Sequence, residues 1–232
     1  MTQQALLFTL NGKEFLMKNT FFQVWIFLIS LLIASTALAI EEPKYIVLEK
    51  SEPFELRAYA PRLVAEVKVD GDLDAASSQG FRLIAAYIFG KNQVSEKIAM
   101  TAPVGIESSD QNKSAKIAMT VPVAIEGAKS FEDASNQWTV SFVMPSEYTL
   151  ATLPKPLNSE VKIRVVPAEK RAVIAFSGFN SAEKAQAKTQ LLQDWIKTKN
   201  LKATGDPQFA RYNPPWSLPF MRRNEILIQV LD

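Results

Sequence analysis

Hydrophobic and polar residues alternate along most of the chain after residue 44, a pattern typical of β-strands that bury one face. Prolines and glycines, such as Pro53, Pro61 and Pro145, separate these segments, and a turn is expected at residues 168–170. The pattern predicts strands at residues 45–49, 54–59, 63–69, 138–144, 161–166, 172–176, 208–212 and 224–231.

Two segments have the 3.6-residue periodicity of an amphipathic helix instead, residues 72–89 and 181–199. Asp72 or Asp74 is expected to cap the first helix and Gly90 to end it, and Asn180 with Glu183 is expected to form a capping box for the second. The apolar stripe of the first helix is Phe81, Ile84, Ala85 and Ile88. That of the second is Ala185, Leu192, Trp195 and Ile196.

A repeat stands between the first helix and the following strand. Lys-Ile-Ala-Met-Thr-Ala-Pro-Val at residues 97–104 returns as Lys-Ile-Ala-Met-Thr-Val-Pro-Val at residues 116–123. Each copy alternates like a half-buried strand and has a proline near its end, which a central strand tolerates badly. We expect two related antiparallel strands joined by a polar loop at residues 108–113, with Met100 opposite roughly residues 119–121.

Each half of the chain therefore has a hairpin, then a helix, then further strands. Helices and strands do not alternate as a parallel sheet requires. We predict one α+β domain made of two such halves, with their sheets merged and two helices on the outside.

The amino-acid composition excludes several kinds of functional site. The 232 residues carry a formal charge of +2 and contain neither cysteine nor histidine. Disulfides, thiolate metal sites, the commonest metal ligand and the commonest general base are therefore all excluded. The nearly balanced charge has no basic run, which disfavours nucleic-acid binding.

Residues 1–39 are predicted to lie outside the fold, as an N-terminal extension followed by a secretory signal. Lys18 precedes an apolar run from residue 21 to 34, and Ala37-Leu38-Ala39 has the small-x-small pattern of a signal-peptidase site. Met17 makes a more natural start than Met1. The expected mature domain is 40–232, exported to the periplasm. The alternative is a membrane anchor at residues 21–38, which would be the one membrane contact.

Several motifs in order resemble the SOUL haem-binding protein family, in its bacterial exported branch. They are the two repeat copies, Ser-Phe-Val-Met-Pro at 141–145, Phe-Ser-Gly-Phe at 176–179, Ala-Arg-Tyr-Asn-Pro-Pro-Trp at 210–216 and Arg-Arg-Asn-Glu at 222–225. The resemblance covers about residues 43–231. It implies two βαββ-type repeats forming a distorted antiparallel barrel or saddle with two outer helices.

The resemblance also implies binding of haem or a related tetrapyrrole in a shallow apolar cleft over the first helix, helped by basic side chains near that helix and near the last loop. Haem is not required for the fold. The basic or methionine side chains of haem-binding relatives are missing here at Ser78, Ala85 and Ala86. The candidate ligand-binding residues are Ser78, Phe81, Arg82, Ala85, Tyr87, Tyr212, Trp216, Arg222 and Arg223.

Most of these residues also have a structural interpretation. The helix residues could be core, Arg222 and Arg223 could pair with Glu225 or cap carbonyls, and Trp216 could close the barrel end. The axial iron ligand is unknown without histidine or cysteine, and the weak candidates are Tyr87, Tyr212, Met100 and Met119. Both tyrosines could instead cap a sheet edge or hydrogen-bond to a loop, and methionine in a strand is usually core.

The sequence thus predicts a non-catalytic binding protein of the cell envelope, whose partner is a tetrapyrrole or another hydrophobic small molecule. One alternative is an envelope protein-interaction module without haem. The other is a hydrolase on the same fold, although no nucleophile elbow, histidine base or carboxylate cluster is present.

Overall fold

The computed structural model of the protein describes residues 41–93, 114–127, 130–132, 137–179, 181–214 and 216–231, all of which belong to one compact unit. The helices in these ranges are α2 (Leu73–Ile88), α3 (Ala182–Thr198) and the short 3-10 helix η1 (Pro219–Met221). The strands are β1 (Tyr45–Ser51), β2 (Phe54–Tyr59), β3 (Arg62–Asp70), β4 (Asn92–Gln93), β5 (Val123–Gly127), β6 (Gln137–Val143), β7 (Lys155–Pro156), β8 (Lys162–Val166), β9 (Glu169–Phe176), β10 (Lys202–Ala203), β11 (Gln208–Arg211) and β12 (Asn224–Leu231).

The start of α2 is as predicted, because the Asp72 carboxylate accepts hydrogen bonds from the backbone N–H groups of Asp74 and Ala75. Ile84 and Ile88 are buried in the main core, and Ala85 is buried as well. The prediction that Phe81 belongs to the buried stripe is wrong: it lies at the edge of the stripe and is 40% exposed.

Two local predictions in the second half need correction. Ser181, not Asn180, caps α3, because its hydroxyl accepts from Lys184 N; Asn180 lies outside the described residues. The expected turn at 168–170 is also displaced. Glu169 and Lys170 already pair with Tyr59 and Ala58 of β2, so β9 starts at Glu169.

The second copy of the repeat is not the predicted strand. Residues 116–122 lie outside the ladders of the sheet, except for a bridge between Glu41 and Thr120, and β5 begins at the last residue of the copy. Its backbone groups find other partners: Ile117 N–H donates to Ile88 O and Val121 N–H donates to Glu41 O. The first copy, with Met100, lies outside the described residues, as does the expected loop.

The main sheet has the order β1-β2-β9-β12-β11-β5-β6-β3-β8, and all of its pairs are antiparallel. The order is symmetric about the contact between β5 and β11. In the first half β3 leads through α2 to β5 and β6; in the second, β9 leads through α3 to β11 and β12. This arrangement confirms the two βαββ repeats and the α+β fold.

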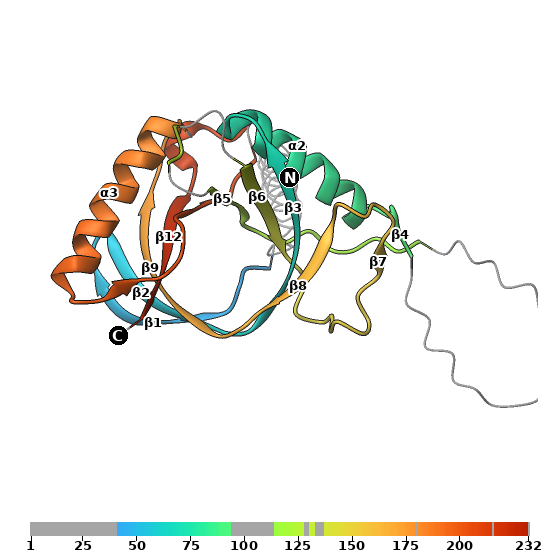
Figure 1. Ribbon diagram of the computed structural model, residues 1–232, viewed down its shortest axis with the longest axis horizontal. Helices are drawn as coiled ribbons and strands as arrows, with labels where there is room; N and C mark the ends of the chain where they lie inside the picture. Colours follow the sequence, from blue (N-terminus) through green and yellow to red (C-terminus); the bar gives the residue numbers. More distant parts are fainter. Residues whose placement is uncertain are drawn as a thin grey trace, which may run out of the picture. The chain divides into compact units, whose positions relative to one another are not determined.

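The sheet is strongly curled, and both helices lie on its outer side (Figure 1). The chain bends at Pro61 between β2 and β3, and at Pro167 between β8 and β9. The β2–β9 and β3–β8 pairs keep one register across these bends. As a result, β2 lies beside the second repeat and β8 lies beside the first. Alternate residues face the helices and build the main core, whose largest fully buried members include Trp138, Tyr87, Phe142 and Phe209. The opposite residues face the inside of the curl.

Candidate functional site

The outward side of α2 is the first of the predicted ligand surfaces. Ser78, Phe81 and Arg82 are exposed there, and Phe89, at the end of the helix, is 57% exposed. The Phe81 ring packs against Phe142 of β6, with ring centroids 5.7 Å apart. The helix therefore offers two phenylalanine rings and a guanidinium to solvent, which suits a flat apolar ligand that bears an anionic group.

Two of the predicted helix residues do not face solvent. Ala85 is buried, and so is Tyr87, whose hydroxyl donates a 2.7 Å hydrogen bond to the carbonyl of Pro154 in the loop before β7. Burial raises the pKa of Tyr87, which keeps this hydroxyl protonated. Tyr87 therefore hydrogen-bonds to a loop, as its structural interpretation predicted.

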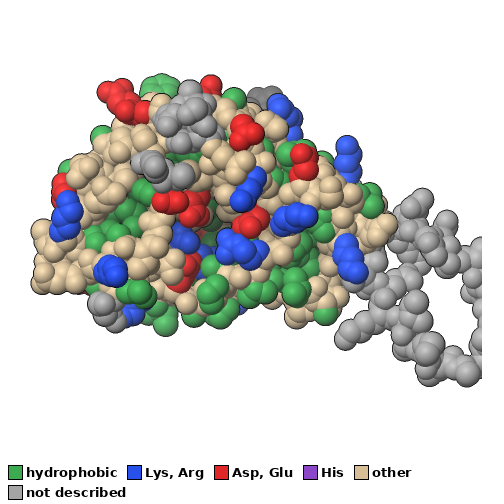
Figure 2. All heavy atoms as spheres, in the orientation of Figure 1, with side chains coloured by type: hydrophobic (Ala, Val, Ile, Leu, Met, Phe, Trp, Pro, Cys, Tyr) green, Lys and Arg blue, Asp and Glu red, His purple; other side chains and the backbone are tan. Residues whose placement is uncertain are grey.

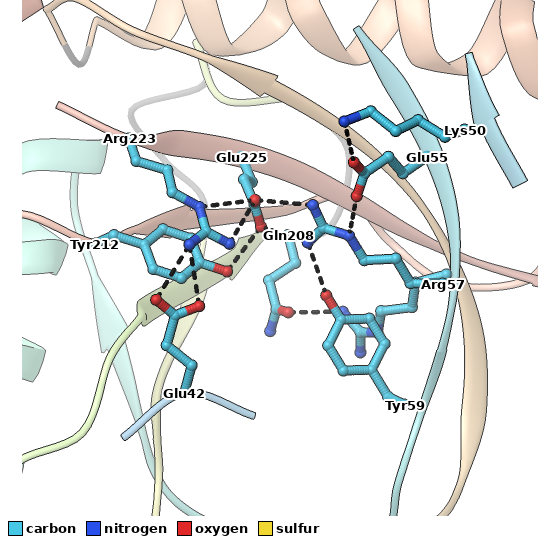
Figure 3. A network of polar contacts seen from close by, with 10 residues as sticks. Glu42, Lys50, Glu55, Arg57, Tyr59, Gln208, Tyr212, Arg223 and Glu225 are labelled. Atoms are coloured by element: carbon cyan, nitrogen blue, oxygen red, sulfur yellow. Dashed lines mark hydrogen bonds and ion pairs between the residues drawn. The ribbon is translucent and has the colours of Figure 1, made fainter. Parts of the chain in front are cut away.

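The inner face of the sheet holds a buried ionic cluster around Glu225 on β12 (Figure 3). Arg57 of β2 donates to both oxygens of this carboxylate, at 3.0 and 3.1 Å. The side chains of Glu225 and Arg57 are 0% and 4% exposed. Arg57 also donates to the Tyr59 hydroxyl, and burial raises the pKa of Tyr59 to about 12.

Two further predicted site residues belong to this cluster. The Tyr212 hydroxyl donates to Glu225 at 2.7 Å, and Arg223 donates to it at 3.1 Å while its guanidinium stacks on the Tyr212 ring. Arg223 also contacts both oxygens of Glu42 (Figure 3). Glu225, Arg57, Tyr59, Tyr212 and Arg223 are called the Glu225 network below.

The electrostatics of the network favour a fixed carboxylate. Burial by itself raises the pKa of Glu225, but hydrogen bonds and charge from Arg57, with Tyr212 and Arg223, hold it below its usual value. Burial and the Glu225 charge raise the pKa of Tyr212, so its hydroxyl stays a donor. Tyr212 and Arg223 are therefore occupied by Glu225, which is the structural alternative for Arg223.

Further charged side chains lie on the inner face. Arg171 of β9 bridges Glu169 and Gln208, at 2.8 and 2.6 Å, and Glu169 also pairs with Arg62. Burial raises the pKa of Glu126 on β5 although the Arg171 charge opposes this shift. In Figure 2 acidic and basic side chains gather within the ring that the strands trace in Figure 1. This interior is thus polar and largely self-paired.

The loop before β12 carries the remaining predicted residues. Arg222 donates to the carbonyl of Ser217 at 2.8 Å, so the capping interpretation holds for it. Trp216 is 83% exposed, so it does not close the end of the barrel, and the nearby Phe220 is 73% exposed.

The structure therefore divides the predicted site into three places: the outward side of α2, the Glu225 network, and the loop of Trp216. Sequence reasoning missed Phe89 and Arg57. The alternation Glu55-x-Arg57-x-Tyr59 was a signal for Arg57, since it puts all three side chains on one face of a strand. Burial of that face depends on β9 and β12, which are distant in sequence.

Iron ligation finds little support among the predicted ligands. Tyr87 and Tyr212 use their hydroxyls elsewhere, and Met119 on the segment before β5 is 37% exposed. Met100 lies outside the described residues. The described residues contain no group of three or more acidic side chains placed for a metal ion. No helix in that part of the chain is long and apolar enough to span a bilayer.

Comparison with known families identifies the class of protein. Residues 40–114 and 106–229 match the model described as SOUL heme-binding protein, so the chain belongs to the SOUL haem-binding protein family. Heme-binding protein 2 of Homo sapiens is 30% identical over 203 residues, covering 84% of this chain and 89% of the relative. Heme-binding protein 2 of Mus musculus is 29% identical over 200 residues, covering 82% and 87%.

Solved structures show the same fold at low identity. The crystal structure of the EcmrR C-terminal domain superimposes with a TM-score of 0.53 at 9% identity, covering 81% of this chain and 98% of that one. EcmrR in its complex with DNA gives 0.51 at 10% identity, covering 96% and 69%. At this identity the likeness concerns the fold alone.

Proposed function

We propose that this protein binds haem or a related tetrapyrrole against the outward side of α2 and does not catalyse a reaction. Membership of the SOUL family is the observation that carries the proposal. Phe81 and Phe89 offer apolar contact to the ring, and Arg82 is placed to donate to a propionate.

Each repeat has one outer helix, so there are two candidate ligand surfaces, and the exposed faces of the two helices differ. The outer face of α3 carries charged residues such as Glu183, Asp194 and Lys197, with Leu191 as its exposed large apolar residue. α2 has two exposed phenylalanines instead. The difference favours α2 as the ligand surface, because a flat ring gains most from aromatic contact.

The chain holds the ring without a histidine or cysteine ligand, since it contains neither. Haem supplies the iron chemistry when bound; the protein residues contribute apolar contact and a cation. Glu225 is a poor general base, because its pKa is lowered and Arg57, Arg223 and Tyr212 already donate to it. This supports a binding role over a hydrolytic one.

Titration with hemin, followed by the Soret band, tests the proposal. We expect binding at micromolar hemin that Phe81→Ser or Phe89→Ser weakens about tenfold. Arg82→Glu should weaken it as well, through repulsion of the propionates. Leu191→Ser and Lys197→Glu, the same kinds of change on α3, should have no effect. Unchanged binding in all the α2 variants would place the ligand elsewhere, and no binding by the wild type would refute the function.

We propose further that the domain acts in the cell envelope, after export by the signal in residues 1–39. The support is the apolar run before Ala37-Leu38-Ala39. N-terminal sequencing of the protein from a periplasmic extract should begin near Ile40. A chain that stays in the membrane fraction with residues 21–38 intact would support the anchor instead.

A further inference from the structure

Two neighbouring loops expose an unusual number of large apolar side chains. One holds Phe179 and the other runs from Trp216 to Met221. Their exposed fractions are 69% for Phe179, 83% for Trp216, 55% for Leu218, 73% for Phe220 and 65% for Met221. These five side chains are called the apolar loop patch. An exposed cluster of this kind is typical of a binding surface rather than of an ordinary monomer surface.

Two hydrogen bonds hold the two loops together and to β12. Gly178 N–H donates to Pro219 O at 2.8 Å, and the side-chain amide of Asn224 donates to Gly178 O at 3.3 Å. Within the second loop, η1 and the bond from Arg222 to Ser217 O fix the turn. The loops are therefore tied to each other and to β12, so their apolar side chains are held outward by the fold itself.

Two lysines on the first turns of α3 adjoin the patch. Lys184 donates its amine to Ser177 O, next to Gly178, and the amines of Lys184 and Lys188 lie 5.7 and 5.9 Å from the Phe176 ring centroid. Among the described residues no ion pair engages either amine, and Glu183 is the acidic side chain of this turn. Within the described part of the chain, positive charge thus accompanies the apolar surface without a paired carboxylate.

We propose that the apolar loop patch docks on an anionic lipid surface. Tryptophan and phenylalanine favour the interface between headgroups and acyl chains, and lysines beside them attract anionic headgroups. The sequence predicts membrane contact through residues 21–38 alone; this surface is a second contact, made by the folded domain. A docked domain would meet lipophilic ligands where they dissolve, but the docking does not depend on tetrapyrrole binding.

Trp216 provides a local readout in the full chain. Residues 21–38 could tether the chain to any bilayer, so bulk co-sedimentation does not test the patch. In a Trp25→Phe chain the remaining tryptophans are Trp138 and Trp195, which are buried, and Trp216. Vesicles of brominated phosphatidylcholine, with or without phosphatidylglycerol, quench a tryptophan that enters the bilayer.

We expect a blue shift and quenching of Trp216 emission on the vesicles that contain phosphatidylglycerol, and no such change in Trp25→Phe/Trp216→Phe. Phe179→Ser/Phe220→Ser should abolish the quenching, whereas Leu157→Ser, an exposed leucine in another loop, should not. Lys184→Gln/Lys188→Gln should weaken vesicle binding about tenfold, and Lys162→Gln/Lys202→Gln, with the same charge change, should not. Unquenched Trp216 in a chain that floats with the vesicles would overturn the proposal.

Discussion

At the scale of residues, the molecule concentrates ionic interactions where water is excluded. Glu225 has no exposed side-chain surface and accepts from two guanidinium groups and a phenol. A buried charge is stable only with such partners. Removing one partner leaves the charge of the remaining groups without compensation. The Glu225 network therefore links β2, β12 and the segment after β11, and we expect it to stabilise the fold.

Glu225→Gln should consequently destabilise the protein by about 3–5 kcal/mol, because the buried Arg57 guanidinium loses the charged carboxylate to which it donates two hydrogen bonds. Urea unfolding followed by circular dichroism measures the loss. The matched control is Glu66→Gln, which breaks a pair with the half-exposed Arg164 and should cost less than about 1 kcal/mol. Equal losses of unfolding free energy in the two variants would show that the Glu225 network does not stabilise the fold more than an exposed ion pair does.

Glu126 and Glu169 should respond to pH with opposite signs. Burial raises the pKa of Glu126, so its ionisation at neutral pH opposes folding, and wild-type stability falls as pH rises through that pKa. Glu126→Gln should raise the melting temperature at pH 7, and the gain should vanish below about pH 4.

The pKa of Glu169 is lowered: burial opposes this, but Arg171 and Arg62 outweigh it. Its ionised form stabilises the fold above the unfolded pKa, and this contribution is lost as pH falls through the folded pKa. Glu169→Gln should therefore lower the melting temperature at pH 7 and have little effect in acid. Melting curves of both variants between pH 3 and 7 test these two predictions. Changes in melting temperature of the same sign at pH 7 would contradict the opposite pKa shifts of Glu126 and Glu169.

At the scale of elements, α2 approaches the sheet closely through Gly80. A Cβ on Gly80 would lie 2.5 Å from Val140 on β6, closer than packed atoms come. Trp138 reinforces the contact by donating to the carbonyl of Gly71 before the helix, at 2.7 Å. The position of the proposed ligand surface thus depends on a missing side chain at one residue of α2.

Gly80→Ala should destabilise the protein although alanine favours helix. Overpacking costs about 1–3 kcal/mol and the better helix propensity of alanine offsets about 1 kcal/mol, so we expect a net loss of up to about 2 kcal/mol. Adding Val140→Ala should recover part of the loss measured in urea. Ser78→Ala, on the exposed side of the same helix, is the control and should be close to neutral. A stabilised Gly80→Ala variant would contradict the close approach.

Local pattern predicted most of these elements. Strand alternation located β2 and β12 at their observed bounds, and the Asp72 cap located the start of α2, because these signals are contained in neighbouring residues. The second repeat copy has strand-like alternation, yet its hydrogen bonds go to α2 and to Glu41. Partners so distant in sequence leave no local signal. For the same reason Arg57 could not be recognised as buried.

At the scale of the whole described domain, two similar repeats have acquired different surfaces. The sheet order is symmetric about β5 and β11, but α2 exposes phenylalanines where α3 exposes charges. The family resemblance predicted the fold and the helix that carries the candidate surface. It did not predict that Tyr212 and Arg223 serve Glu225, since that requires the geometry of β12 beside β2 and β11.

In the proposed complex the tetrapyrrole lies on α2, held by ring contacts and a cation, without histidine or cysteine on the iron. Parallel titrations with hemin and metal-free protoporphyrin IX, read by absorbance and by quenching of tryptophan emission, test it most directly. We expect dissociation constants within about tenfold of each other, and Phe81→Ser should raise both. Binding of hemin without protoporphyrin IX, or of neither compound, would contradict it.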